Sequence, residues 1–130
     1  MDIKETATGF QHIGIPTNDI EATIAFYEKL GFTVALRTIN KQANEQVAFL
    51  QLNDLMIETY ENHQAAMNSG ALDHLAINVT DIDSAFSYIS ENGLNSEDDT
   101  IHFLPFWENG VKFFTITGPN KEKIEFSQYL

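Results

Sequence analysis

Two histidines and two glutamates recur at matching places in this sequence and have the chemistry to bind a metal ion together. His12 and His74 each open a short apolar run, and Glu58 and Glu125 each follow an isoleucine in a later apolar run. Two imidazoles and two carboxylates suit a divalent ion such as Ni, Co, Zn, Mn or Fe, with positions left open for water. The chain has no cysteine, which excludes sulfur-rich sites. We expect these four residues to converge on one divalent cation.

Each of the four residues, taken singly, has a more ordinary interpretation. A lone histidine at a strand start is usually a hydrogen-bonded structural residue, and a glutamate after an isoleucine could be the solvated half of an alternating strand. Their correspondence between two halves of the chain favours the metal site. His63 and His102 have no such counterpart, and we interpret them as loop or strand-end residues.

The correspondence arises from an internal repeat. A shift of 62 positions (74 − 12) aligns HIGIPTNDIEATIAFYEKLGF, residues 12–32, with HLAINVTDIDSAFSYISENGL, residues 74–94, without a gap. Both copies read as a short buried strand and then a helix with apolar residues at helical spacing. Each helix is predicted to end at a glycine, Gly31 or Gly93. Chance similarity is the alternative, but strand, helix start and helix end agree together.

The two helix starts carry polar residues that can cap the free backbone amides. The candidates are Asn18 or Asp19 in the first copy and Thr80 or Asp81 in the second.

Three strands are expected after each helix. In order along the chain they cover residues 32–36, 47–52 and 55–58, then 101–106, 111–116 and 123–126. Residues 96–99 read as a solvent loop. The predicted fold class is therefore α+β, with two tandem βαβββ modules at about residues 8–62 and 70–130 in a single domain of 130 residues.

The composition narrows the possible partners. The formal charge of −12 disfavours binding to nucleic acid or to anionic lipid, and no apolar run approaches the length of a membrane span. The polar, acidic start MDIKETATGF lacks the features of an export signal, so a cytoplasmic location is expected.

The whole pattern resembles the vicinal-oxygen-chelate superfamily, which includes glyoxalase I, methylmalonyl-CoA epimerase, extradiol dioxygenases and the fosfomycin- and bleomycin-resistance proteins. The resemblance lies in HIGIPTNDIEATIAFYEKLGF, in HLAINVTDI and in LPFWENGVKFFTITGPNKEKIEF. It implies a half-open barrel of two βαβββ modules around a metal site, and often a homodimer.

The order His, Glu, His, Glu is similar to the metal site of bacterial glyoxalase I, a lyase known as lactoylglutathione lyase. This resemblance implies proton transfer on a small hemithioacetal or α-hydroxycarbonyl substrate, with Glu125 or Glu58 as the base and Glu125 preferred. Extradiol dioxygenases would ordinarily lack the carboxylate at Glu58, and epimerases usually place glutamine there. Both remain alternatives, as does a non-catalytic protein that binds a small molecule or a drug.

Substrate recognition departs from the glyoxalase pattern at one position. The family commonly has arginine where Pro16 stands, so anchoring the carboxylates of glutathione would fall to Arg37 or to lysines. A different thiol adduct or a neutral substrate is therefore also possible. Phe106 and Trp107 are candidates for the substrate pocket, with ordinary core packing as the alternative.

Overall fold

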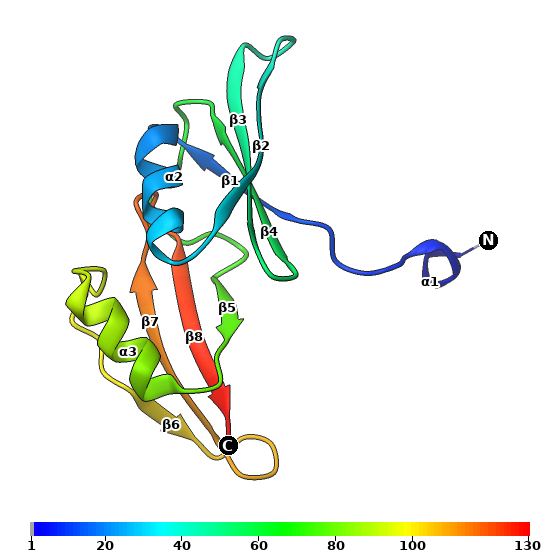
Figure 1. Cartoon of the computed structure of the whole chain (residues 1–130). Coiled ribbons are helices and arrows are strands. Elements are labelled where there is room, and N and C mark those ends of the chain that lie inside the picture. Colours follow the sequence, from blue (N-terminus) through cyan, green and yellow to red (C-terminus); the bar gives the residue numbers. More distant parts are fainter. Residues whose placement is uncertain (1) are drawn as a thin grey trace. The chain divides into compact units, whose positions relative to one another are not determined.

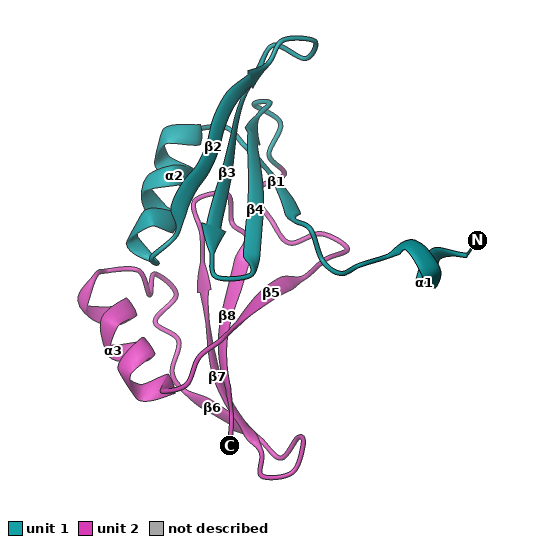
Figure 2. Ribbon diagram, turned by 45° about the vertical axis from the view of Figure 1, so that its right-hand side comes forward, with its two compact units in different colours: residues 1–65 teal, residues 66–130 magenta. Residues whose placement is uncertain are grey.

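The computed structural model describes residues 2–130, which form two compact units, one ending at Ala65 and the other beginning at Ala66 (Figure 2). The predicted modules, 8–62 and 70–130, fall inside these units. The first unit contains α1 (Ile3–Thr6), β1 (Ile13–Thr17), α2 (Ile20–Lys29), β2 (Thr33–Asn40), β3 (Glu45–Leu52) and β4 (Leu55–Glu61). The second contains β5 (His74–Asn78), α3 (Ile82–Glu91), β6 (His102–Leu104), β7 (Val111–Thr117) and β8 (Lys123–Tyr129). The predicted α+β class and the duplicated βαβββ order are confirmed.

Both long helices begin and end where the sequence signals lie. Asp19 caps α2 and Asp81 caps α3, and each carboxylate accepts a hydrogen bond at 3.1 Å from the backbone N–H three residues further along. These contacts satisfy amides that have no partner inside the helix. Just beyond the helix ends, Gly31 and Gly93 have φ values of 102° and 67°, a conformation that glycine adopts without steric cost.

The last strand of each unit supplies a second cap to the helix of that unit. Glu61 on β4 accepts a hydrogen bond from the N–H of Ile20 at 2.8 Å, and Gln128 on β8 accepts one from the N–H of Ile82, also at 2.8 Å. In each unit, this hydrogen bond connects the first helical turn to the strand that also carries the candidate metal-binding glutamate.

Each unit has a four-stranded mixed sheet of the same topology. The strand orders are β1-β4-β3-β2 and β5-β8-β7-β6, with the first and last strands of each unit parallel and the other pairs antiparallel. Gly14 lies opposite Glu58, and Ala76 lies opposite Glu125. Both small residues follow a histidine by two positions, so the repeat places each histidine diagonally across from its glutamate.

One face of each sheet packs against the helix of its own unit (Figure 1). On β4, Ile57 and Thr59 are buried on the face toward α2, and Glu58 between them points to the other face. On β8, Ile124 and Phe126 are buried in the same way, and Glu125 points away from α3. The alternation of each strand therefore keeps the glutamate out of the hydrophobic core.

The strands after each helix differ in length from their predicted ranges: β6 is shorter than predicted, and the others are longer. β2 runs on to Asn40 and contains an irregularity between Val34 and Leu36. β6 covers only His102–Leu104, because Pro105 follows and cannot donate a backbone hydrogen bond to β7. In residues 2–130, no helix has the length and apolarity needed to cross a bilayer.

Candidate metal centre

The first unit brings together one imidazole and one carboxylate. His12 lies just before β1 and Glu58 lies on β4, with 3.4 Å between the His12 Nε2 and Glu58 Oε1 atoms. Both side chains are partly exposed, at 32% and 28% of their surface. The edge of the His12 ring also contacts the ring of Phe49, at a centroid distance of 5.6 Å. This aromatic contact restricts the ring without using either nitrogen.

The second unit repeats the arrangement. His74 is the first residue of β5 and Glu125 lies on β8, with 3.6 Å between His74 Nε2 and Glu125 Oε2. Their side chains are 45% and 20% exposed. In both units, therefore, the same imidazole nitrogen faces the carboxylate.

These separations fit two ligands of one transition-metal ion. Two donors about 2.1 Å from a cation, at an angle of about 90–110°, are about 3.0–3.4 Å apart. The observed 3.4 Å and 3.6 Å are close to that spacing and longer than a good N–H···O hydrogen bond. Among residues 2–130, no group of three or more His, Cys, Asp or Glu side chains is placed to hold a metal ion. Convergence of the two pairs on one ion stays a prediction.

The other nitrogen of each ring is also hydrogen bonded. His12 Nδ1 lies 2.8 Å from Gln11 Oε1, and His74 Nδ1 lies 2.9 Å from Asp73 Oδ2. Lys123 Nζ in turn lies 3.2 Å from Asp73 Oδ1. The pKa of Asp73 is lowered, first by its hydrogen bond with His74 and then by its hydrogen bond with Lys123 and the positive charge of that lysine. The carboxylate of Asp73 is therefore ionised at neutral pH.

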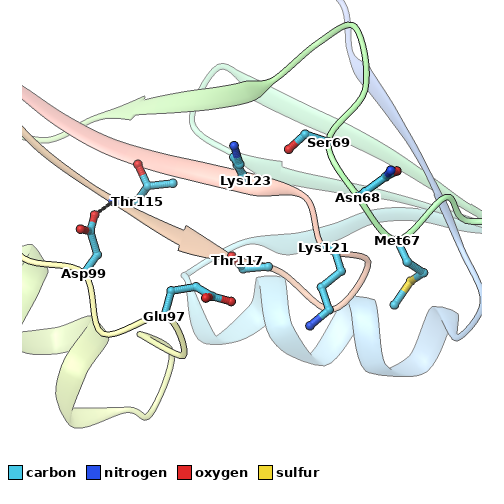
Figure 3. Close-up of a pocket in the computed structure, with 9 residues that line it drawn as sticks. All are labelled: Met67, Asn68, Ser69, Glu97, Asp99, Thr115, Thr117, Lys121 and Lys123. Carbon is cyan, nitrogen blue, oxygen red and sulfur yellow. Dashed lines mark hydrogen bonds between the residues drawn. The ribbon is translucent and has the colours of Figure 1, made fainter.

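The second unit contains a cavity of about 460 Å³ (Figure 3). The sheet register places Thr117 opposite Lys123 and Thr115 opposite Glu125, so these four side chains share one sheet face. The lining consists of Met67, Asn68 and Ser69 before β5, Glu97 and Asp99 after α3, Thr115 and Thr117 on β7, Lys121 in the β7–β8 turn, and Lys123 on β8.

The charged groups of this cavity differ in whether they already have a partner. Asp99 accepts from the Thr115 backbone N–H at 2.8 Å, drawn in Figure 3, and lies 2.7 Å from His102 Nε2. Partial burial raises the pKa of Asp99, but these hydrogen bonds outweigh the burial and the pKa is lowered. Glu97 and Lys121, by contrast, make no side-chain hydrogen bond or ion pair with any residue that the structure describes.

Arg37, proposed from the sequence as a substrate anchor, is engaged elsewhere. It lies on β2 opposite Ala48, on the sheet face that packs against α2, and its guanidinium forms a bidentate ion pair with Glu21 of that helix. The hydrogen bond from Arg37 lowers the pKa of Glu21. Glu58 lies on the other face of the same sheet, so the structure does not bring Arg37 together with the His12–Glu58 pair.

Phe106 and Trp107 lie in the loop between β6 and β7. They are 55% and 75% exposed, so they are not core residues. Trp107 has a φ of 63° and its ring meets the edge of Tyr129 at a centroid distance of 5.6 Å. Neither residue lines the cavity of the second unit, and their role in a substrate pocket stays a prediction.

The sequence reasoning missed the lysines of the cavity and the partners of the histidines. The sequence did contain a signal for the partners of the histidines, because the shift that aligns His12 with His74 also aligns Gln11 with Asp73. Both of these side chains offer an oxygen acceptor. Lys121 and Lys123 flank the turn before the last predicted strand, and no pattern in the sequence tied them to His74.

Comparisons with known proteins agree with this architecture. The family model described as "Glyoxalase/Bleomycin resistance protein/Dioxygenase superfamily" matches residues 9–126. The uncharacterised protein YwbC of Bacillus subtilis is 32% identical over 127 residues, which are 94% of this chain and 98% of YwbC.

Two solved structures show the same fold at lower identity. A bleomycin resistance determinant encoded on transposon Tn5 has a TM-score of 0.69 at 20% identity, covering 93% of this chain and 98% of its own. The fosfomycin resistance protein FosX of Listeria monocytogenes, in complex with Mn(II) and sulfate, has a TM-score of 0.68 at 15% identity, covering 96% and 95%. The family match over nearly the whole chain, the YwbC relative and the duplicated βαβββ units together establish that this chain belongs to the glyoxalase/bleomycin resistance protein/dioxygenase superfamily.

Proposed function

We propose that this protein is a metal-dependent lyase or isomerase of the glyoxalase type. In this proposal His12, Glu58, His74 and Glu125 bind one divalent cation, which would polarise the carbonyl of a substrate with adjacent carbonyl and hydroxyl oxygens. The observation that carries the proposal is the repeated His–Glu pair, with Nε2–O separations of 3.4 and 3.6 Å on strands of the same register. The Mn(II) in the FosX structure supports a divalent cation in this fold.

Glu125 is the preferred base. It would accept the proton from the carbon that bears the hydroxyl and return it to the neighbouring carbon, while the hydroxyl proton passes to the former carbonyl oxygen, so that carbonyl and hydroxyl exchange places. General acid–base catalysis of this kind contributes a factor of about 10²–10⁴. Two observations favour Glu125 over Glu58: its side chain is less exposed, and Thr115 opposite it lines the cavity.

The remainder of the substrate is proposed to lie in the cavity of the second unit. Lys121 and Lys123 offer ammonium groups there, in a chain whose formal charge is −12, and Ser69, Thr115 and Thr117 add hydroxyl groups. An anionic group on the substrate is better assigned to Lys121 than to Arg37, because Lys121 makes no ion pair among the described residues, whereas Arg37 is paired with Glu21 and Lys123 with Asp73.

Turnover by the metal-loaded protein tests the proposal. The protein loaded with Ni, Co, Zn or Mn is assayed with the methylglyoxal–glutathione hemithioacetal and with hemithioacetals of other thiols. We expect turnover that falls about 10²–10⁴-fold in Glu125→Gln. Glu91→Gln removes an equal charge from the end of α3 and should keep full activity. Absence of metal-dependent turnover on every adduct, or an unchanged rate in Glu125→Gln, would contradict the proposal.

A second candidate function is the sequestering of an organic cation without turnover. The net charge of −12 and the exposed Trp107–Tyr129 ring contact favour it, since aromatic faces and an acidic field both attract cations. Trp107 is the sole tryptophan of the chain, so its fluorescence reports binding directly. Quenching by bleomycin in the metal-free protein, together with no retained metal, would favour this function over the enzyme.

A further inference from the structure

We propose that Gln11 and Asp73 are positioning residues that hold the two imidazoles with Nδ1 protonated and Nε2 free to bind the metal. This inference rests on the proposed function, because it assigns His12 and His74 as metal ligands. It adds a pair of residues that act on the ligands and do not themselves touch the cation.

The hydrogen-bond chemistry fixes the tautomer. The Gln11 atom that faces His12 is the amide oxygen, at 2.8 Å from Nδ1, and the Asp73 atom that faces His74 is a carboxylate oxygen, at 2.9 Å from Nδ1. Either oxygen can only accept, so Nδ1 of each ring must donate. In the neutral ring, Nε2 then carries a lone pair, which is the form that binds a metal.

The same contact turns Nε2 toward the glutamate. With Nδ1 held from one side, the Nε2 atoms lie 3.4 Å from Glu58 and 3.6 Å from Glu125. Metal-binding histidines commonly donate their second nitrogen to a carboxylate or carbonyl, which orients the ring and makes it a stronger ligand. Here the residue that immediately precedes each histidine supplies that acceptor.

Two independent occurrences argue against a chance surface contact. Gln11 and Asp73 occupy equivalent positions of the repeat, yet their side chains differ in length and charge. Even so, each reaches Nδ1 of the next residue at almost the same distance.

The two rings are nevertheless held unequally. Asp73 is anionic and its other oxygen lies 3.2 Å from Lys123 Nζ, which restrains the carboxylate, whereas Gln11 is neutral and has no other side-chain partner in residues 2–130. A charged acceptor makes a stronger hydrogen bond than a neutral one. We therefore expect removal of Asp73 to affect its ring more than removal of Gln11 does.

Nitrogen-15 NMR of the imidazole rings in the metal-free protein tests this inference without any metal. At about pH 8, where imidazole is largely neutral, His12 and His74 should both show Nδ1–H rings. Asp73→Ala should shift His74 toward the Nε2–H form, and Asp73→Asn, which keeps an acceptor oxygen, should restore Nδ1–H. His63, whose exposed ring lies 3.6 Å from Glu61, should not change and serves as the internal control.

Zn(II) affinity, measured by competition with a chromophoric chelator, provides the second measurement. We expect Asp73→Ala to weaken binding about 10–100-fold and Asp73→Asn to recover part of that loss. Gln11→Ala should weaken binding by less. Glu91→Ala, which removes a carboxylate at the end of α3, and Gln42→Ala, in the β2–β3 turn, are the matched controls and should leave the affinity unchanged.

The two measurements separate this inference from the proposed function. Nε2–H rings in a protein that binds Zn(II), or a tautomer of His74 that Asp73→Ala does not change, would overturn the positioning role and leave the proposed function standing. Nδ1–H rings in a protein that binds no divalent metal would overturn the proposed function and, with it, the role of these residues toward a metal.

Discussion

At the scale of single residues, the site depends on the two faces that each strand presents. Glu58 and Thr59 are neighbours on β4, but Glu58 faces away from α2 and Thr59 is fully buried beneath that helix. The strand can therefore carry a charged candidate ligand on one side and close the hydrophobic core on the other. The burial of Thr59 has an energetic cost, however, because its hydroxyl has no hydrogen-bond partner among residues 2–130.

This hydroxyl leads to a prediction about stability. An unsatisfied buried hydroxyl is destabilising, so Thr59→Val should raise the free energy of unfolding by about 1 kcal/mol. Thr17→Val, at an equally buried position of β1, should lower it by about 1–3 kcal/mol. The reason is that Thr17 Oγ1 bonds Thr23 Oγ1 at 2.9 Å and accepts from the Asp19 N–H at 3.0 Å. Urea unfolding of both variants measures these two changes in the free energy of unfolding. Equal changes in the same direction would contradict the prediction.

The contacts of single residues could be predicted from the sequence only in part. The repeat pairs each histidine with a glutamate, and the structure places each histidine beside the glutamate of its own unit, while their role as metal ligands stays a prediction. The environment of Arg37 was not predictable, since its pairing with Glu21 depends on which face of β2 meets α2. A side chain of that length binds the nearest carboxylate, and the sequence does not show which carboxylate that is.

At the scale of elements, local signals determine the helices more closely than the strands. The sequence predicted a cap at Asn18 or Asp19 and at Thr80 or Asp81, with a glycine after each helix, and in the structure Asp19 and Asp81 are the caps. The second caps from Glu61 and Gln128 were not predictable, because they connect residues more than 40 positions apart. Strand lengths depend on partners in the same way, and β6 is shorter than predicted because Pro105 ends its pairing.

The α3 cap predicts a pH dependence of stability. The backbone and side-chain hydrogen bonds from Ser84 lower the pKa of Asp81 in the folded protein. The ionised cap therefore stabilises the fold fully above the unfolded aspartate pKa of about 3.9, and this contribution is lost as the pH falls through the lower folded pKa. Asn caps a helix as well as Asp does and does not titrate.

Comparison of the wild-type protein with Asp81→Asn measures this effect. The wild-type advantage in urea midpoint should be largest above about pH 5 and should shrink as the medium becomes more acidic than about pH 4. Asp83→Asn, at a neighbouring exposed position of the same helical turn, provides the control for a lost charge. A difference between wild type and Asp81→Asn that grows on acidification would contradict the prediction.

At the scale of the whole molecule, the duplicated module makes the proposed function possible. Each unit contributes one imidazole and one carboxylate, which is too few ligands for a tight metal site, and two such units supply four. The second unit also contains a cavity on the sheet face of Glu125, and its lining carries two lysines, Lys121 and Lys123, and two carboxylates, Glu97 and Asp99. The two halves therefore carry equivalent candidate ligands.

Metal stoichiometry tests the central claim most directly. The metal-free protein is titrated with Zn(II) by calorimetry, and the titration is repeated with Glu58→Gln and Glu125→Gln. If both pairs bind one cation, the wild type takes up one ion per chain, and either variant loses about 10-fold or more in affinity for that single ion. Two ions per chain, with each variant losing only one of them, would show two separate two-ligand sites and contradict the account.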